Sequence, residues 1–145
     1  MTITAIYETS ARASGGREGH VSTLDGSLSL KMGAPAVLGG SGEGNNPEQL
    51  FAAGYAACFL NALKFTALRE KSPFPADAEV TATIGIGQRP QGGYGLTAAM
   101  AVTLPGMEQD AAQALVAKAH GTCPYSNATR NNLDVHFSVN GAMSG

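Results

Sequence analysis

Apolar and polar residues alternate in two short stretches of the first third of the chain. The stretch from 2 to 7 places apolar residues at every second position, and the stretch from 28 to 32 repeats this pattern after an Asp25-Gly26 pair. A period of two is typical of a half-buried strand, and Asp-Gly is a turn signal. The pattern therefore predicts a small antiparallel sheet, followed by a glycine-rich loop over 33–46.

A long apolar segment follows this loop. Asn46 is a suitable N-cap, Pro47 fits the first helical position, and Gln49 stands where the partner in a capping box belongs. Apart from Gly54, no helix breaker follows until Lys71. The sequence therefore predicts one helix over this range, with a length of ~37 Å at 1.5 Å per residue.

The first two-thirds of this helix are apolar on nearly every side, from Leu50 to Leu60. A helix of this kind is buried all round, and one small domain can hardly surround it alone. The sequence therefore predicts a homodimer in which this helix is central. A membrane span is not expected, because the apolar stretch ends at Leu63, is shorter than a bilayer requires and contains Asn61.

The rest of the chain alternates strands with one longer helix. Apolar residues alternate over 80–86 and again over 94–104, which predicts a second hairpin with one buried face. The segment 110–120 is an Ala-rich amphipathic helix, and 133–139 alternates as a last strand. This order predicts the α+β class, with antiparallel sheets packed around the long helix in a single domain over 1–145.

Composition and charge remove several function classes. The 145 residues include nine basic and eleven acidic side chains, so the net charge is -2 and there is no basic surplus for binding nucleic acid. A hydrophobic content of 43% with 14% charged residues argues against a disordered chain. The first ten residues do not resemble a secretory signal, so we expect a cytoplasmic protein.

The chain has two cysteines, Cys58 and Cys123, which are too few and too far apart for a disulfide scaffold or a zinc site built from cysteine pairs. Cys58 lies in the middle of the long helix, and a small buried apolar residue is the more common role of a lone cysteine. If Cys58 is reactive, the helix dipole cannot stabilise its thiolate, because that effect fades within the first turn. A cationic side chain must then come from elsewhere.

Arg17, in the glycine-rich bend 15–19, is a candidate for that cation, and Glu48 is a candidate for the carboxylate that holds it by two parallel hydrogen bonds. Both can instead be solvated surface charges. Glu48 and Cys58 are ten residues apart, so they stand ~15 Å apart along a continuous helix. They share a site only if the helix breaks near Gly54, or if Glu48 of one subunit meets Cys58 of the other.

Cys123 precedes Pro124 at the start of a short helical turn, where backbone N–H groups favour a thiolate. It could therefore serve as a second sulfur for Cys58. His120 lies three residues upstream, and a His-x-x-Cys pair invites a metal interpretation. Two further ligands with suitable spacing are missing, so we expect no metal.

Three segments of the chain resemble the organic hydroperoxide resistance branch of the OsmC-like proteins. They are the bend at 15–19, the long-helix segment 46–59, and His120 together with the Cys-Pro-Tyr-Ser segment 123–130. They run in the family's order, and the resemblance covers nearly the whole chain. The long-helix motif together with Cys-Pro-Tyr-Ser is specific, whereas the bend alone is weak.

The resemblance implies an intertwined homodimer and a bacterial thiol peroxidase that reduces organic hydroperoxides at two sites on the subunit interface. By this likeness Cys58 matches the peroxidatic cysteine and Cys123 the resolving cysteine, while Arg17 and Glu48 match the pair that activates Cys58. Similar proteins take electrons from lipoyl groups on dehydrogenase-complex proteins, so a dithiol such as dihydrolipoamide is the expected reductant. They need no metal, flavin or haem.

Phe51, Tyr55 and Phe59 on the long helix are expected to contact the alkyl or fatty-acid tail of the substrate, which gains roughly 0.8 kcal/mol per buried methylene. Hydrogen peroxide has no tail and gains none of this. Two other functions remain open. A Cys-dependent hydrolase would pair Cys58 with a histidine base such as His120, and a non-enzymatic module would bind an apolar ligand or a lipoyl carrier with both cysteines merely buried.

Overall fold

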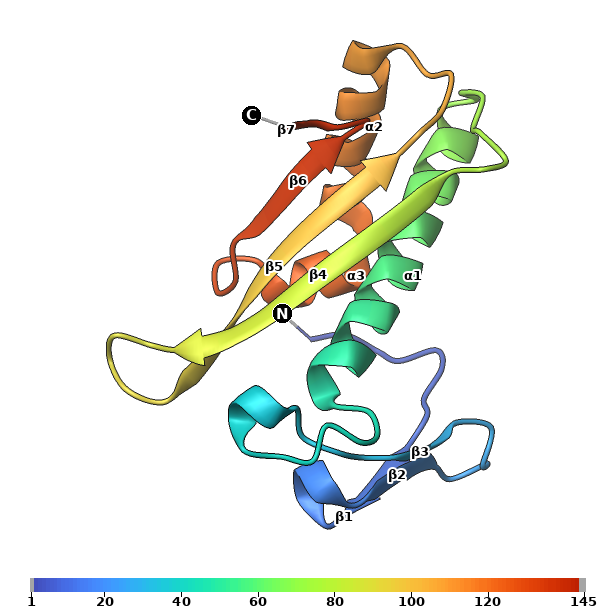
Figure 1. Cartoon of the computed structure of the whole chain (residues 1–145). Coiled ribbons are helices and arrows are strands. Elements are labelled where there is room, and N and C mark those ends of the chain that lie inside the picture. The colour runs from blue at the N-terminus through green and yellow to red at the C-terminus, as the bar shows by residue number, and fades with distance from the viewer. Residues whose placement is uncertain (1, 144–145) are drawn as a thin grey trace. The chain divides into compact units, whose positions relative to one another are not determined.

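The structure is a computed structural model that describes residues 2–143, in two compact units that meet in sequence at Leu50 and Phe51. Figure 1 shows the elements along the chain. They are β1 (Ala11–Ser14), η1 (Gly16–Glu18), β2 (His20–Thr23), β3 (Ser29–Lys31), η2 (Ala36–Leu38), α1 (Pro47–Arg69), β4 (Glu79–Gln88), β5 (Tyr94–Thr103), α2 (Gln109–Thr122), α3 (Pro124–Thr129), β6 (Val135–Val139) and β7 (Ala142–Met143). The predicted α+β class is confirmed.

The first unit contains a three-stranded antiparallel sheet in the order β1-β2-β3. Its β2–β3 turn is the Asp25-Gly26 turn, in which Gly26 has a φ of 76° that favours glycine. Asp25 Oδ1 accepts hydrogen bonds from the backbone N–H of Ser27 and from the Thr23 hydroxyl. These bonds lower the pKa of Asp25 to about 2. The small antiparallel sheet predicted for the first third is therefore confirmed.

The strand predicted over 2–7 is wrong. Residues 2–10 form no strand, and the first strand begins at Ala11. Ile3, Ile6 and Tyr7 are exposed, so the alternating side chains have no buried face within this chain. A strand is stable only when its backbone groups pair with a neighbour, and the described residues supply no neighbour to this stretch.

Helix α1 begins at the predicted capping box. Gln49 N–H donates to Asn46 Oδ1 over 2.9 Å, and Asn46 N–H donates to Gln49 Oε1 over 3.0 Å. The helix then continues without interruption through Gly54 to Arg69. The alternative in which the helix breaks near Gly54 is therefore wrong.

The second unit contains a four-stranded sheet in the order β4-β5-β6-β7. The predicted hairpin is confirmed, because β4 and β5 pair antiparallel over their full length. β6 pairs parallel to β5, which corrects the expectation of purely antiparallel sheets. A parallel neighbour requires a crossover connection, and α2 with α3 supplies it. The helices lie on one face of this sheet (Figure 1).

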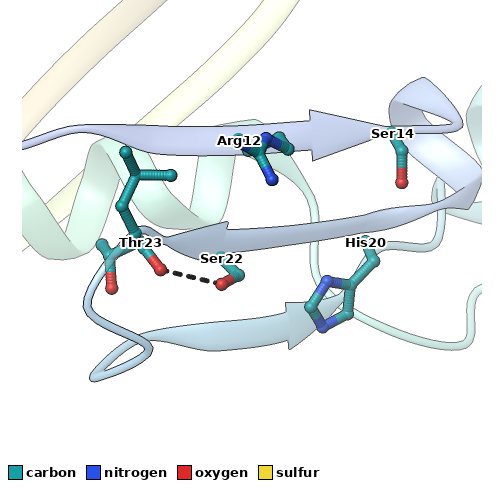
Figure 2. A pocket seen from close by; sticks show the side chains of 6 residues that line it. Arg12, Ser14, His20, Ser22 and Thr23 are labelled. Atoms are coloured by element: carbon teal, nitrogen blue, oxygen red, sulfur yellow. Dashed lines mark hydrogen bonds between the residues drawn. The ribbon is translucent and has the colours of Figure 1, made fainter.

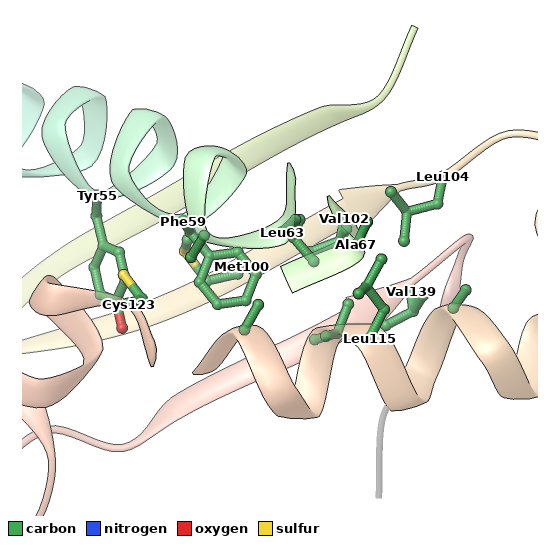
Figure 3. Close-up of a cluster of buried hydrophobic side chains, with 14 residues drawn as sticks. Tyr55, Phe59, Leu63, Ala67, Met100, Val102, Leu104, Leu115, Cys123 and Val139 are labelled. Atoms are coloured by element: carbon green, nitrogen blue, oxygen red, sulfur yellow. The ribbon is translucent and has the colours of Figure 1, made fainter. Parts of the chain in front are cut away.

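The core of the second unit lies between α1, the sheet and α2. Figure 3 shows Tyr55, Phe59 and Leu63 projecting from α1 into this core. The largest fully buried side chains are Tyr55, Phe59, Leu63, Met100, Leu104, Val102, Val116 and Val139. This packing fixes α1 against the α2–α3 segment, and it thereby positions the two cysteines.

Helix α1 is only partly buried within one chain. By length and composition alone it could cross a membrane, with a mean hydropathy of 1.3, and the core helix of a soluble protein meets the same criteria. One face carries the core residues just described, whereas Phe65 and Leu68 are 52% and 75% exposed. Large apolar side chains on two sides of a helix call for two covering surfaces, and the described residues of the second unit supply one of them.

Candidate active site

Two free thiols lie in contact in the second unit. Cys123 Sγ donates a hydrogen bond to Cys58 Sγ over 3.5 Å, although the two residues are 65 positions apart in sequence. Cys58 on α1 is half-buried, and Cys123 is fully buried. A disulfide bond is ~2.05 Å long, so a shift of about 1.5 Å would join the two sulfur atoms. The tertiary fold therefore brings together the two cysteines that the sequence separates.

The position of Cys123 follows from the proline after it. Pro124 restricts the preceding residue to extended backbone, and Cys123 has a φ of -67° and a ψ of 125°. Helix α2 therefore ends at Thr122, and Cys123 N–H bonds to Ala119 O over 2.8 Å. Cys123 is thus the C-cap of α2 and the N-cap of α3, and its side chain points into the core.

The surroundings of Cys58 within the second unit favour the protonated thiol. Burial raises the pKa of Cys58, and the adjacent Cys123 raises it further, whereas the backbone N–H of Tyr125 lowers it. A raised pKa reduces the thiolate fraction at neutral pH, and the thiolate is the nucleophilic form. A nearby positive charge would oppose this shift and favour the thiolate.

Arg17 and Glu48 form a two-pronged ion pair in the first unit. Arg17 Nη1 donates to Glu48 Oε2 over 2.8 Å, and Nη2 donates to Oε1 over 2.6 Å. The hydrogen bond with Glu48 raises the pKa of Arg17, and the same bond lowers the pKa of Glu48. Both groups therefore stay charged at neutral pH, and the carboxylate fixes the plane of the guanidinium.

The bend that carries Arg17 depends on its glycines. Gly15 and Gly16 have φ values of 72° and 59°, which favour glycine. A Cβ at Gly19 would lie 1.7 Å from a backbone oxygen of β1, so this position also excludes a side chain. Glu18 accepts a hydrogen bond of 3.1 Å from the backbone of the loop after β3. The bend is thus held at both ends around Arg17.

The three aromatic residues expected to contact substrate have different environments. Tyr55 and Phe59 are fully buried, and the Phe59 ring packs against Phe137 with centroids 5.2 Å apart. Phe51 is partly buried, and its ring centroid lies 6.2 Å from that of Tyr125, which is 40% exposed. The accessible apolar surface on this side of α1 therefore comes from Phe51 and Tyr125, while the other two rings support the core.

Tyr125 is a site residue that the sequence analysis missed. Its backbone N–H acts on Cys58, and its ring lies over Gly54 on α1. A Cβ at Gly54 would meet the Tyr125 hydroxyl at 3.0 Å, so glycine lets the ring approach the helix closely. Two features of the sequence could have indicated this contact: Gly54 lies four residues before Cys58, and Tyr125 lies two residues after Cys123.

A buried serine between two helices was also missed. Ser126 Oγ lies 2.8 Å from Tyr55 Oη and 2.8 Å from His120 Nδ1. Burial and the charge of Arg130 lower the pKa of His120, so its ring is neutral at neutral pH. The Nδ1 atom of His120 is engaged by Ser126, and no hydrogen bond joins His120 to Cys58 among residues 2–143. Residues 2–143 contain no group of three or more His, Cys, Asp and Glu side chains suited to a metal ion.

A separate hollow of about 270 Å³ lies on the sheet of the first unit, as Figure 2 shows. It is lined by Arg12, Ser14, His20, Ser22, Thr23 and Leu24. This lining is largely polar and contains no cysteine. The hollow therefore lacks both the nucleophile and the apolar walls that an alkyl peroxide site needs, and the thiol pair is the better candidate.

Comparisons with known proteins place these residues in a family context. Residues 40–138 match the family model described as OsmC-like protein. An organic hydroperoxide resistance protein from Xanthomonas axonopodis pv. citri (strain 306) is 49% identical over 92% of this chain and 94% of its own. An uncharacterised protein from Acinetobacter baylyi is 51% identical over 92% of this chain and 93% of its own.

A solved structure is similar over nearly the full length. It is described as an organic hydroperoxide resistance protein from Vibrio cholerae with captopril bound in one of the active sites. It is 50% identical, with a TM-score of 0.92, and the match covers 99% of this chain and 98% of that chain. At this identity and coverage the likeness extends beyond the fold to the sequence as a whole.

Proposed function

Because this chain belongs to the OsmC-like family and has a role in organic hydroperoxide resistance, we propose that it is a thiol peroxidase that reduces alkyl and fatty-acid hydroperoxides to alcohols. Cys58 is the peroxidatic cysteine and Cys123 the resolving cysteine. The observation that carries this proposal is the contact of 3.5 Å between the two sulfur atoms, one half-buried and one fully buried. The half-buried thiol of Cys58 is accessible to a substrate, and the buried thiol of Cys123 is in contact with it.

The first two steps follow from this arrangement. The Cys58 thiolate attacks the terminal peroxide oxygen, so that an S–O bond forms as the O–O bond breaks. The alkoxide leaves and takes up a proton, which yields the alcohol and Cys58 sulfenic acid. Cys123 sulfur then attacks the sulfenic sulfur, and the displaced hydroxyl leaves as water with the thiol proton. The peroxide has gained two electrons, and the two cysteines are joined in a disulfide.

A dithiol completes the cycle by exchange. Its first thiolate opens the disulfide to a mixed disulfide, and its second thiol releases the protein thiol while closing its own ring. We assign this role to a lipoyl-type dithiol, either dihydrolipoamide or the lipoyl group of a dehydrogenase-complex protein. The Vibrio cholerae relative binds captopril in an active site, and captopril carries a thiol, which supports access of a thiol compound to such a site. The cycle uses no bound cofactor.

Arg17 supplies the positive charge that Cys58 lacks. A guanidinium beside Cys58 would favour the thiolate and would stabilise the alkoxide as its charge develops. Because α1 is continuous, Glu48 and Cys58 stand ~15 Å apart along one helix. In the proposed homodimer, the Arg17–Glu48 pair of one protomer therefore lies beside Cys58 of its partner, which gives two such sites.

Burial within the chain supports the homodimer. In the first unit the buried apolar side chains are Met32 and Ala34, too few for a core of its own. Phe65 and Leu68 on α1 add exposed apolar surface in the second unit. A second copy would cover both, and each chain would act as one domain over 1–145 in the cytoplasm. Light scattering that gives the mass of a single 14.7 kDa chain would contradict this assembly.

The proposed activity is tested by substrate preference. With dihydrolipoamide as reductant, the protein is expected to consume a linear alkyl hydroperoxide faster than hydrogen peroxide. Full burial of four methylenes is worth about 3 kcal/mol, or about 100-fold in rate. The readout is loss of peroxide in parallel assays, with glutathione as a monothiol comparison. Equal rates for both peroxides, or no turnover with any dithiol, would contradict the proposal.

Replacing Cys123 with serine separates the two steps. Without reductant, Cys123→Ser is expected to consume one peroxide per chain to give the sulfenic acid, and, with peroxide in excess, a second one to give the sulfinic acid, because no second sulfur traps the sulfenic acid. Intact mass spectrometry reports the two added oxygen atoms, and wild type should instead lose two hydrogen atoms on forming the disulfide. A variant that never reacts with peroxide, or that turns over and resists overoxidation as wild type does, would be incompatible with this assignment.

A further inference from the structure

Ser126 lies at the centre of a buried hydrogen-bond network that joins three helices. Its side chain is fully buried on α3, and its Oγ lies 2.8 Å from Tyr55 Oη on α1 and 2.8 Å from His120 Nδ1 on α2. A serine hydroxyl has one hydrogen to donate and two lone pairs to accept. Two partners therefore satisfy a hydroxyl that has no access to solvent.

Each member of this network is three residues away from a cysteine. Tyr55 precedes Cys58 by three positions, His120 precedes Cys123 by three, and Ser126 follows Cys123 by three. Residues three apart are neighbours on a helix surface. Tyr55 is therefore a neighbour of Cys58 on α1, and Figure 3 shows Tyr55 and Cys123 within the same buried cluster.

Other hydrogen bonds hold the turn at Cys123 without reaching α1. Asn127 N–H donates to Cys123 O over 2.9 Å, and Arg130 Nη2 donates to His120 O over 2.6 Å. These bonds act within the α2–α3 segment. The bond between Ser126 and Tyr55 instead ties this segment to the helix that carries Cys58, and so it acts on the distance between the two thiols.

The two chemical steps depend differently on that distance. Reduction of the peroxide uses the sulfur of Cys58, whereas disulfide closure requires Cys123 Sγ to move about 1.5 Å closer from its present contact. Groups held in place react at a high effective concentration, and loosening one of them lowers it. A tie between α1 and α3 should therefore affect closure and leave the peroxide step unaffected.

On the basis of the proposed peroxidase function, we propose that Ser126, bridging Tyr55 and His120, is a positioning residue for the resolving cysteine, and that it sets the rate at which the Cys58–Cys123 disulfide closes. Closure competes with overoxidation of Cys58 sulfenic acid. In closure the sulfenic hydroxyl leaves as water; in overoxidation a second peroxide gives one oxygen atom to the sulfur and leaves as an alcohol. A faster closure therefore protects Cys58 from the sulfinic state.

The test is a single-turnover experiment with Ser126→Ala. Fully reduced protein is mixed with cumene hydroperoxide and quenched in acid at intervals, and the thiol, sulfenic, sulfinic and disulfide forms are separated by intact mass. Loss of the first peroxide is expected at the wild-type rate, whereas disulfide closure is expected to slow about 10-fold or more. The sulfinic fraction at excess peroxide should rise accordingly.

Control variants separate positioning from general destabilisation. Thr66→Val removes another buried hydroxyl from α1, one that bonds only within its own helix to Ala62 O, and it should leave closure unchanged. His120→Leu removes the Nδ1 partner and should slow closure, whereas His120→Asn can return a polar atom to that position and should restore part of the rate. If Ser126→Ala does not fold, this histidine pair tests the same network.

Equilibration with dithiothreitol provides a readout that does not need peroxide. The disulfide of Ser126→Ala should be easier to reduce than that of wild type, with an equilibrium constant changed about 10-fold. Unchanged closure together with an unchanged equilibrium constant would overturn the inference. If wild type consumes no peroxide, the proposed function fails instead, and the dithiothreitol equilibrium alone then decides whether Ser126 positions Cys123.

Discussion

Cys58→Ser is expected to lower the turnover of an alkyl hydroperoxide by about 1,000-fold or more, to the uncatalysed background. A serine hydroxyl stays protonated at neutral pH and cannot accept the peroxide oxygen as a thiolate does. Cys58 is the half-buried member of the thiol pair, so its sulfur is the one a substrate can reach. The measurement is the steady-state loss of the peroxide with dihydrolipoamide as reductant.

A matched control is available on the same helix. Ala57 is the exposed neighbour of Cys58, and Ala57→Ser adds a hydroxyl to α1 without touching the thiol pair. It should keep wild-type turnover, and thermal unfolding should show that both serine variants remain folded. Substantial turnover by Cys58→Ser would assign the nucleophile to another residue.

Arg17→Ala is expected to lower turnover at pH 7 by about 100-fold, the loss typical when one oriented charge-stabilising donor is removed. Burial already raises the pKa of Cys58, so the thiolate fraction is small unless a cation is nearby. Removing that cation raises the pKa of Cys58 further. Activity should therefore fall at neutral pH and recover as the pH rises toward the new pKa, and the pH–rate profile of the variant should be displaced to higher pH.

Two further arginine variants sharpen this prediction. Arg17→Lys keeps the charge but cannot reproduce the two-pronged bond to Glu48, so its rate should lie between those of wild type and Arg17→Ala. Arg12→Ala removes an exposed charge on β1 and should leave the profile in place. A profile for Arg17→Ala that coincides with that of wild type would show that the pair does not act on Cys58.

Local patterns predicted most of the helices and strands correctly. The capping box at Asn46 and Gln49 begins α1 as expected, and alternation over 80–86 and 94–104 became the β4–β5 hairpin. These features depend on residues close in sequence, where periodicity and capping chemistry decide the conformation. Alternation over 2–7 failed because a strand also needs a neighbour, and no periodic pattern supplies one.

The candidate site was predictable in part. The cysteines and the Arg17–Glu48 pair were identifiable because their residue types are unusual and their chemistry is specific. Ser126 was not identifiable as part of the candidate site, since serine is a common residue. Its hydrogen-bond partners are Tyr55, which is 71 positions away in sequence, and His120, which lies on a different helix. For Tyr55 and Phe59 the substrate contact stays a prediction; the structure shows both rings buried in the core, and residue type alone does not distinguish a substrate wall from a core.

The sequence by itself determined most of the helical and strand content, the end of α2 before Pro124 and the residue types able to carry thiol chemistry. Only the tertiary structure decided that Cys58 and Cys123 touch, that β6 runs parallel to β5, and that Ser126 joins α1 to the segment bearing Cys123. The physical reason is the sequence distance over which each kind of interaction acts. Backbone preferences act over a few residues, whereas a contact across 65 positions exists only when the packing of the whole core brings two helices together.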